Sequence, residues 1–121
     1  MKKNIIKDKS FDFAVRIVNL NKFLQEKREY ILSKQILRSG TSIGAMICES
    51  EHAESNIDFI HKLAIAQKEA NETIYWLELL FKTKFIDKKM FNSLKNDLIE
   101  IQKILTSIII TSKKKNKKIN N

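Results

Sequence analysis

The two histidines are the first side chains to test for chemistry, because each follows a carboxylate at a spacing that metal sites use. Glu49-x-x-His52 matches the pattern that di-iron bundle proteins place on one helix, and Asp58-x-x-His61 comes shortly after it. A metal site within a bundle needs ligands that point inward, whereas the apolar periodicity turns both histidines outward. The sequence therefore predicts no metal site.

Nucleophilic catalysis has equally weak support. Cys48 is the only cysteine, and it falls beside the apolar seam of a helix, where we expect a small buried side chain. Ser39, Thr41 and Ser42 lack a base at any suggestive spacing and are better explained as small packing residues. We predict a protein without catalytic residues or cofactors. The single cysteine excludes an intrachain disulfide and fits a reducing cytoplasm.

Basic side chains are the strongest chemical signal. The chain has a net charge of +9, and five lysines fall in residues 113–118, after the last carboxylate, Glu100. Lysine and arginine attract phosphate in a sequence-independent, salt-dependent way. A basic tail can also be a solvated segment, and Tyr75 and Trp76 could stack on bases or be buried. The residues that we expect to bind nucleic acid are Arg16, Arg28, Lys34, Arg38, Lys62, Lys68, Lys113, Lys114, Lys115, Lys117 and Lys118.

Three carboxylates, Glu49, Glu69 and Glu72, are a further candidate group. Glu49 and Glu69 occupy positions that flank the apolar seams of their helices. Carboxylates at such positions commonly pair with basic side chains, although they can also bind a ligand. The sequence favours salt bridges and does not assign their partners.

Long helices must position these side chains. Proline is absent and glycine occurs twice, which favours helices joined by short turns. The apolar spacing predicts an all-α, antiparallel, up-down-up-down four-helix bundle with left-handed packing. Residues 1–9 then form a flexible N-terminus, the bundle covers residues 10–112, and residues 113–121 form a basic disordered tail. The predicted helices cover residues 10–27, 29–54, 56–82 and 87–112, with Ser10, Ser55 and Asp87 as N-caps.

The second helix contains both glycines, Gly40 and Gly44, near an apolar seam that includes Ile43 and Met46. Glycine within a helix costs about 1 kcal/mol relative to alanine, so two of them suggest a packing requirement. Close approach of a neighbouring helix is the favoured explanation. A ligand or a second subunit is the alternative.

The third and fourth helices have apolar faces wider than a bundle core requires. Such surface would be exposed in a monomer, and large exposed apolar patches mark interfaces. We therefore expect a homo-oligomer, whose subunits meet through Ile74, Trp76, Phe81, Ile104 and Ile109.

Three segments resemble a known family. They are Gln35-Ile36-Leu37-Arg38-Ser39-Gly40-Thr41-Ser42-Ile43-Gly44-Ala45, Asp58-Phe59-Ile60 and Lys68-Glu69-Ala70-Asn71-Glu72-Thr73-Ile74-Tyr75-Trp76-Leu77. In order and spacing they are similar to the bacterial four-helix-bundle proteins of the 23S rRNA intervening-sequence type, over roughly residues 10–112. One departure is Met46, where the family usually has asparagine, so an apolar contact would replace a polar one.

The resemblance implies a small cytosolic bundle that assembles as a ring-like homopentamer without enzymatic activity. Members are often encoded inside insertions in the large ribosomal RNA gene. Related proteins are accessory factors of diversity-generating retroelements, where they bind nucleic acid and a reverse transcriptase.

Charge and resemblance together predict a non-enzymatic oligomeric bundle that binds RNA or DNA and acts as an adaptor, with a nucleic-acid enzyme as a further partner. The alternative is a protein-interaction scaffold without a nucleic-acid ligand. No apolar run approaches membrane-spanning length, and the N-terminus has too short an apolar region for a secretory signal. We expect a soluble cytoplasmic protein without a membrane partner.

Overall fold

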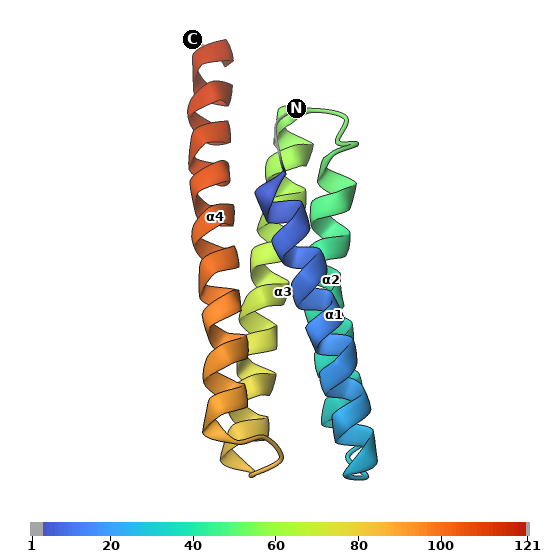
Figure 1. The fold of residues 1–121 in the computed structure, drawn as a ribbon. Helices are drawn as coiled ribbons and strands as arrows, with labels where there is room; N and C mark the ends of the chain where they lie inside the picture. Colours follow the sequence, from blue (N-terminus) through green and yellow to red (C-terminus); the bar gives the residue numbers. More distant parts are fainter. Residues whose placement is uncertain (1–3, 121) are drawn as a thin grey trace.

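The computed structural model describes residues 4–120, with side chains up to Lys117. It contains four helices: α1 (Ile5–Glu26), α2 (Leu32–Ser50), α3 (Asn56–Lys82) and α4 (Lys88–Asn120). Each helix runs antiparallel to the one before it and packs against it, and α1 closes the bundle against α4 (Figure 1). The predicted all-α, up-down-up-down bundle is confirmed, and residues 4–120 contain no strand.

The first helix begins at Ile5 instead of near Ser10. Asn4 is its N-cap, and the Asn4 side-chain oxygen accepts a hydrogen bond from the Lys7 backbone N–H at 3.1 Å. Ser10 lies inside the helix, is buried, and donates its hydroxyl proton to the Lys7 carbonyl. Ile6 anchors the added turn in the core. The predicted flexible N-terminus is therefore wrong from Ile5 onward, and residues 1–3 lie outside the described chain.

Ser55 and Asp87 cap α3 and α4 as predicted. The Ser55 hydroxyl oxygen accepts a hydrogen bond from the Asp58 N–H at 3.0 Å, and the Asp87 carboxylate accepts one from the Met90 N–H at 2.8 Å. These side chains satisfy N–H groups that have no partner within the first turn of a helix. The predicted bounds of α3 are confirmed.

The second helix is shorter than predicted at both ends. It begins at Leu32, because Glu29 acts as a cap from outside the helix. The Glu29 carboxylate accepts hydrogen bonds from the N–H groups of Ile31 at 3.3 Å and Ser33 at 2.7 Å. At the other end the helix stops at Ser50, and residues 51–55 connect it to α3.

The buried face of α2 is rotated relative to the predicted seam. Ile43 is buried as predicted, but Ile47, at 1% exposure, replaces Met46 as the next inward side chain. The buried positions 33, 36, 40, 43, 47 and 50 keep the three-four spacing, so the inward face shares Ile36, Ile43 and Ser50 with the predicted seam but extends to its other side. Met46 is half-buried and packs against the core. Cys48 is exposed, so the prediction that it is buried is wrong.

The fourth helix continues beyond Ser112, its last buried residue. The Ser112 carbonyl accepts a hydrogen bond from the Asn56 side chain at 2.8 Å. Residues 113–120 extend the helix past the ends of the other three (Figure 1). The predicted disordered tail is therefore wrong for residues 113–120. Once a helix exists, each added residue gains one hydrogen bond and avoids the cost of nucleation, so the helix can continue into polar sequence. Lysines at its C-terminus also suit the helix dipole.

The helices α1 and α3 end with the same backbone motif. The N–H groups of Glu29 and Phe85 each bond the carbonyl five residues earlier, at 2.9 Å. This closure places the preceding residue in the left-handed region, and that residue is Arg28 (φ 62°) in one loop and Lys84 (φ 68°) in the other. Glycine usually occupies this position, because a side chain costs about 1–2 kcal/mol there.

The two glycines bring α1 and α2 close together. A Cβ atom on Gly40 would lie 2.8 Å and 2.9 Å from the Cγ1 and Cγ2 atoms of Ile17, which is fully buried. A Cβ atom on Gly44 would lie 3.3 Å from the backbone oxygen of Ser10. Helix contact, the favoured explanation of these glycines, is confirmed.

We expect Gly40→Ala to destabilise the protein by about 1–2 kcal/mol, because overlap with Ile17 outweighs the gain of about 1 kcal/mol in helix propensity. Equilibrium denaturation in urea measures this change. Ile17→Ala alone should cost about 2–5 kcal/mol. The double substitution should cost less than the sum, since each change relieves the other. Strictly additive costs would contradict a close contact at this position.

Candidate nucleic-acid interface

Arg16, one of the predicted phosphate-binding residues, joins α1 to α4. Its guanidinium group lies 2.5 Å from the Asp97 carboxylate and donates a hydrogen bond to the Ser93 hydroxyl at 2.8 Å. Lys9, two turns earlier, pairs with Glu100 at 2.9 Å. These contacts bridge the helix pair that packs least extensively in the bundle. The charge of Arg16 is therefore matched within the chain.

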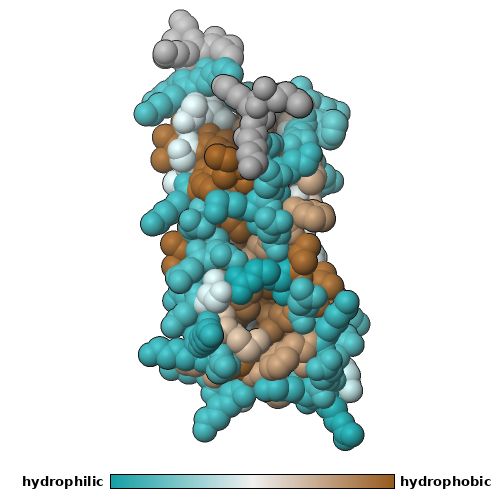
Figure 2. Space-filling model, in the orientation of Figure 1, coloured by the Kyte–Doolittle hydropathy of each residue, from teal (hydrophilic) through white to brown (hydrophobic). Residues whose placement is uncertain are grey.

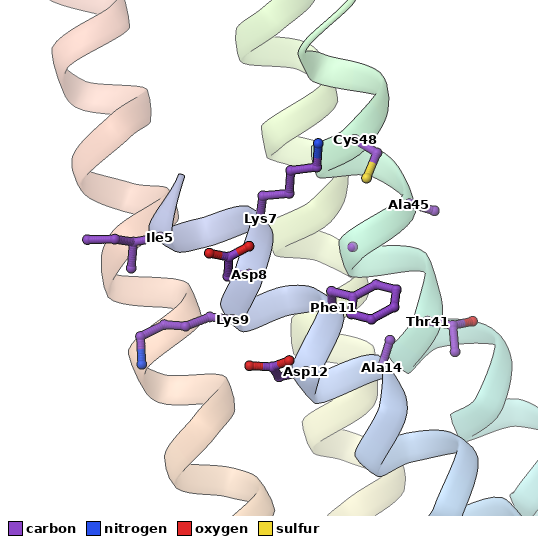
Figure 3. Close-up of a pocket in the computed structure, with 11 residues that line it drawn as sticks. Ile5, Lys7, Asp8, Lys9, Phe11, Asp12, Ala14, Thr41, Ala45 and Cys48 are labelled. Atoms are coloured by element: carbon purple, nitrogen blue, oxygen red, sulfur yellow. The ribbon is translucent and has the colours of Figure 1, made fainter. Parts of the chain in front are cut away.

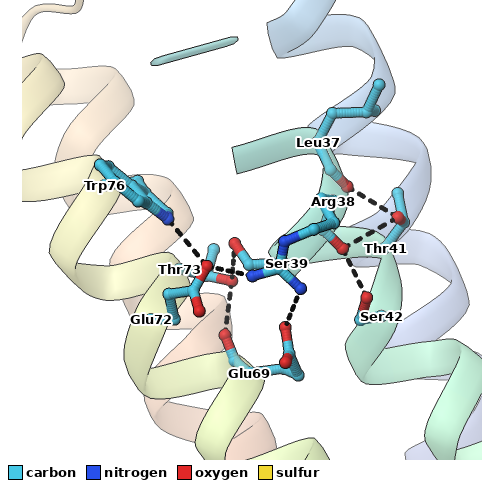
Figure 4. A network of polar contacts seen from close by, with 9 residues as sticks. All are labelled: Leu37, Arg38, Ser39, Thr41, Ser42, Glu69, Glu72, Thr73 and Trp76. Carbon is cyan, nitrogen blue, oxygen red and sulfur yellow. Dashed lines mark hydrogen bonds and ion pairs between the residues drawn. The ribbon is translucent and has the colours of Figure 1, made fainter. Parts of the chain in front are cut away.

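Arg38 also forms ion pairs with carboxylates, and these join α2 to α3. Figure 4 shows its guanidinium group against the carboxylates of Glu69, at 3.0 Å, and Glu72. The Glu72 carboxylate also accepts the indole N–H of Trp76 at 3.0 Å. The hydrogen bonds from Trp76 and Arg38 lower the pKa of Glu72, and Glu72 in turn raises the pKa of Arg38. Glu69 and Glu72 thus form salt bridges, as predicted, and the partner of both is Arg38.

The hydroxyl side chains around this network are bonded within the bundle. Ser39 and Thr73 are buried and hydrogen-bonded to each other at 2.9 Å, across α2 and α3. Thr41 and Ser42 each donate to a carbonyl one turn earlier on α2, at 2.7 Å and 2.6 Å (Figure 4). These bonds agree with the packing role predicted for Ser39, Thr41 and Ser42.

Protonation of Glu72 should weaken the network at low pH. Because the pKa of Glu72 is lower in the folded chain than its ordinary value of 4.5, its contribution is present above about pH 4.5 and is lost as the pH falls through the folded value. We expect Glu72→Gln to cost at most about 1 kcal/mol at pH 7 and less at pH 3, because protonation of Glu72 then removes part of the charge that the substitution deletes.

Urea denaturation at both pH values measures this difference. Glu54→Gln is the control, since Glu54 is exposed and forms no ion pair within the described residues. Equal costs of Glu72→Gln at pH 7 and pH 3 would show that the network does not depend on the Glu72 charge.

Basic side chains without acidic partners gather at the two ends of the bundle. We call residues 113–120 the C-terminal arm. Its four described lysines are exposed, and none forms an ion pair with another described residue. The predicted site residue Lys118 has its side chain outside the described part of the structure. The four described lysines are Lys113, Lys114, Lys115 and Lys117.

The opposite end carries a second basic cluster, which includes the predicted residues Arg28 and Lys34. Figure 2 shows hydrophilic side chains projecting from this lower end of the molecule. The individual basic residues are visible in the sequence. Their grouping depends on the antiparallel topology, which brings the α1–α2 and α3–α4 loops to the same end (Figure 1). We call this cluster the loop-end patch, and it consists of Lys27, Arg28, Lys34, Lys82, Lys84, Lys88 and Lys89.

Lys62 and Lys68, the other predicted residues, lie on α3 along the side of the bundle. Lys68 contributes to the lowered pKa of Glu72. The predicted interface is thus divided: Arg16 and Arg38 pair with carboxylates, Lys62 and Lys68 lie on one side, and the rest belong to the two ends.

An apolar groove of about 830 Å³ lies between α1 and α2. In Figure 3, Phe11 and Ala14 of α1 lie across the groove from Ala45 and Cys48 of α2. The Phe11 side chain is 66% exposed. We call this surface the α1–α2 groove. Its charged lining residues are Lys7, Asp8, Lys9 and Asp12.

The predicted subunit interface on α3 and α4 is less exposed than expected. Four of its residues, Ile74, Trp76, Phe81 and Ile104, are half-buried against the core. Ile109 is 8% exposed and belongs to the core of a single chain, which argues against its predicted role. Sequence reasoning missed the apolar exposure of α1, because only packing shows which side of that broad apolar helix faces out. The large exposed apolar side chains of α1 are Ile5, Phe11, Val15 and Val18.

Within residues 4–120, no three histidine, cysteine, aspartate or glutamate side chains come together as a potential metal site. His52 and His61 are exposed, as the helical periodicity predicts. None of the described helices combines the length and apolar character needed to cross a membrane.

Comparison with known proteins places the chain in context. A family model described as 23S rRNA-intervening sequence protein matches residues 2–107. The crystal structure of a protein of unknown function from the S23 ribosomal protein family of Bacteroides thetaiotaomicron VPI-5482 is similar over most of this chain. The two chains share 63% identity with a TM-score of 0.85, over 86% of this chain and 97% of that one. The comparison with curated proteins found no match.

Proposed function

The chain belongs to the 23S rRNA-intervening sequence protein family, and on that premise we propose that it is a non-enzymatic accessory protein that binds RNA or DNA. The binding is electrostatic and directed to the phosphate backbone. A nucleic-acid enzyme is the further partner that such an adaptor would serve, and the cytoplasm is the compartment that we expect.

The observation that carries this proposal is unmatched positive charge at the ends of the bundle. Lysines of the C-terminal arm have no carboxylate near them in sequence, because no Asp or Glu follows Glu100. Cations that contact phosphates release condensed counterions, which makes binding favourable at low salt and independent of base sequence. A helical arm presents these cations on a defined scaffold, which favours contact with several neighbouring phosphates.

Self-association is part of the same proposal, with a ring-like homopentamer as the expected form. When two unlike surfaces of neighbouring copies bind each other, the assembly closes into a ring if the repeated rotation from one copy to the next returns to the first copy. The α1–α2 groove provides a concave apolar surface for one side of such a contact, and Phe11 is its most exposed large side chain. A ring also multiplies the charge of each end by the number of subunits.

The α1–α2 groove also supports the alternative function, a protein-interaction scaffold. An amphipathic helix of another protein can dock in a groove of this kind. In that case the positive charge would serve solubility alone. Nucleic-acid binding by the folded chain separates the two functions.

We expect replacement of Lys113, Lys114, Lys115 and Lys117 by glutamine to weaken binding to a short mixed-sequence RNA and to its DNA equivalent. The slope of log K against log salt should fall by about 0.7 for each single-strand phosphate contact that is lost. Fluorescence anisotropy of labelled oligonucleotides over a salt series measures both quantities.

The matched control replaces four lysines on the sides of the bundle, Lys22, Lys62, Lys68 and Lys103, by glutamine. It removes the same charge while leaving both ends intact, so its salt slope should change less than that of the arm variant. Equal changes would show that binding follows net charge and has no defined site. No binding by the wild type at low salt would end the nucleic-acid proposal and favour the scaffold.

We expect Phe11→Glu to shift the assembly towards monomer, because it places a charge in the α1–α2 groove. Light scattering after gel filtration at micromolar concentration measures the mass. The stability of the subunit should change by no more than about 0.5 kcal/mol, since Phe11 is 66% exposed. Ile57→Glu is the control, because Ile57 is equally exposed and lies outside the groove. A monomeric wild type would end the proposal of a ring.

A further inference from the structure

The two loops at the loop end form one surface. The Lys27 ammonium group donates a hydrogen bond to the Phe85 carbonyl at 3.2 Å, which joins the α1–α2 loop to the α3–α4 loop. Each loop places an exposed basic residue, Arg28 or Lys84, in the left-handed conformation that favours glycine. The helix-ending motif accounts for the conformation, and in both loops a basic residue stands where glycine would cost less. The shared property of the two side chains is positive charge.

The charge of this surface is unbalanced. Residues 26–34 and 82–89 contain seven basic side chains and three carboxylates, a balance of +4. Two of the carboxylates, Glu29 and Asp87, accept hydrogen bonds from backbone N–H groups as helix caps. None of the seven basic side chains forms an ion pair with another described residue. The loop-end patch therefore has charge available for an anionic ligand.

Apolar surfaces suited to unpaired bases adjoin these charges. Tyr30, in the α1–α2 loop, is 59% exposed. A recess of about 340 Å³ lies between the loops, and its lining combines apolar side chains such as Phe23 and Phe81 with the cations Lys27 and Lys84 and one carboxylate, Asp87, which caps α4. This volume is at the lower end of the range for ligand pockets, which suits a single nucleobase better than a larger ligand.

We propose that the loop-end patch binds single-stranded nucleic acid, with Arg28 and Lys84 on phosphates and Tyr30 stacked on an unpaired base. This inference rests on the proposed nucleic-acid function and gives it a second site, opposite the C-terminal arm. A single strand offers phosphates and free base faces together. A duplex keeps its bases stacked, so it can use the charges of the patch but not the Tyr30 ring.

The left-handed positions of Arg28 and Lys84 allow a test in which lost binding cannot come from unfolding. Arg28→Gly/Lys84→Gly removes two charges and relieves backbone strain that outweighs the added flexibility of glycine, so the full-length variant should melt at or above the wild-type temperature. Its binding to a short single-stranded RNA should weaken, and the slope of log K against log salt should fall by about 1.4. The control Lys22→Gln/Lys103→Gln removes two exposed charges from the sides and should keep the wild-type slope.

Tyr30→Ala should weaken single-strand binding by about five- to a hundredfold, as loss of one stacked base does. The salt slope should stay unchanged, because stacking is not an ionic contact, and binding to duplex should also stay unchanged. Tyr75→Ala is the matched control, since Tyr75 is 58% exposed on α3, and it should bind as the wild type does.

Three outcomes would overturn the inference, and they differ in what they leave standing. Wild-type binding by the glycine variant, with loss only in the arm variant, removes the loop-end site and keeps the nucleic-acid function. Single-strand binding by Tyr30→Ala equal to that of the wild type removes the stacking contact and, with it, the preference for single strands. Failure of the wild-type chain to bind any RNA or DNA at low salt removes both the site and the function.

Discussion

The close contact between α1 and α2 determines the arrangement of the other surfaces. Gly40 and Gly44 allow Ile17 and the Ser10 backbone to approach within a distance that a side chain would block. The other contact of α1, with α4, is less extensive and is bridged by half-exposed ion pairs, which contribute little free energy. The position of α1, and so both the α1–α2 groove and the meeting of the two loops, depends on these glycines.

Charge is distributed differently along the bundle and at its ends. On the sides, Arg16 and Arg38 are held by carboxylates of the neighbouring helix. At the ends, the C-terminal arm and the loop-end patch have lysines and arginine without such partners. The sides also carry lysines without an ion pair among the described residues, such as Lys62 and Lys103. The ends therefore differ in how closely their cations cluster, and this clustering raises the local positive potential that the proposed function requires.

The fold could be predicted from sequence because its signal is repeated in every helix. The bounds of α3 and the caps Ser55 and Asp87 were accessible from local residue types. Local residue types did not predict the start of α1 or the end of α4, since both helices continue into polar sequence. The rotation that buries Ile47 in place of Met46 depends on how α2 fits its neighbours. At the site, residue types identified the cations, but only the cross-helix register shows that Arg38 meets Glu69 and Glu72.

The length of α4 has a consequence for the size of the ligand. Its 33 residues span about 50 Å at 1.5 Å per residue, from the loop-end patch to the C-terminal arm. At about 3.4 Å per nucleotide along a stacked strand, this equals about 15 nucleotides. A shorter strand can occupy one end only, whereas a longer one can reach both, and the second contact then becomes intramolecular. In the proposed function, the length of α4 therefore sets the shortest strand that can gain avidity by contacting both ends.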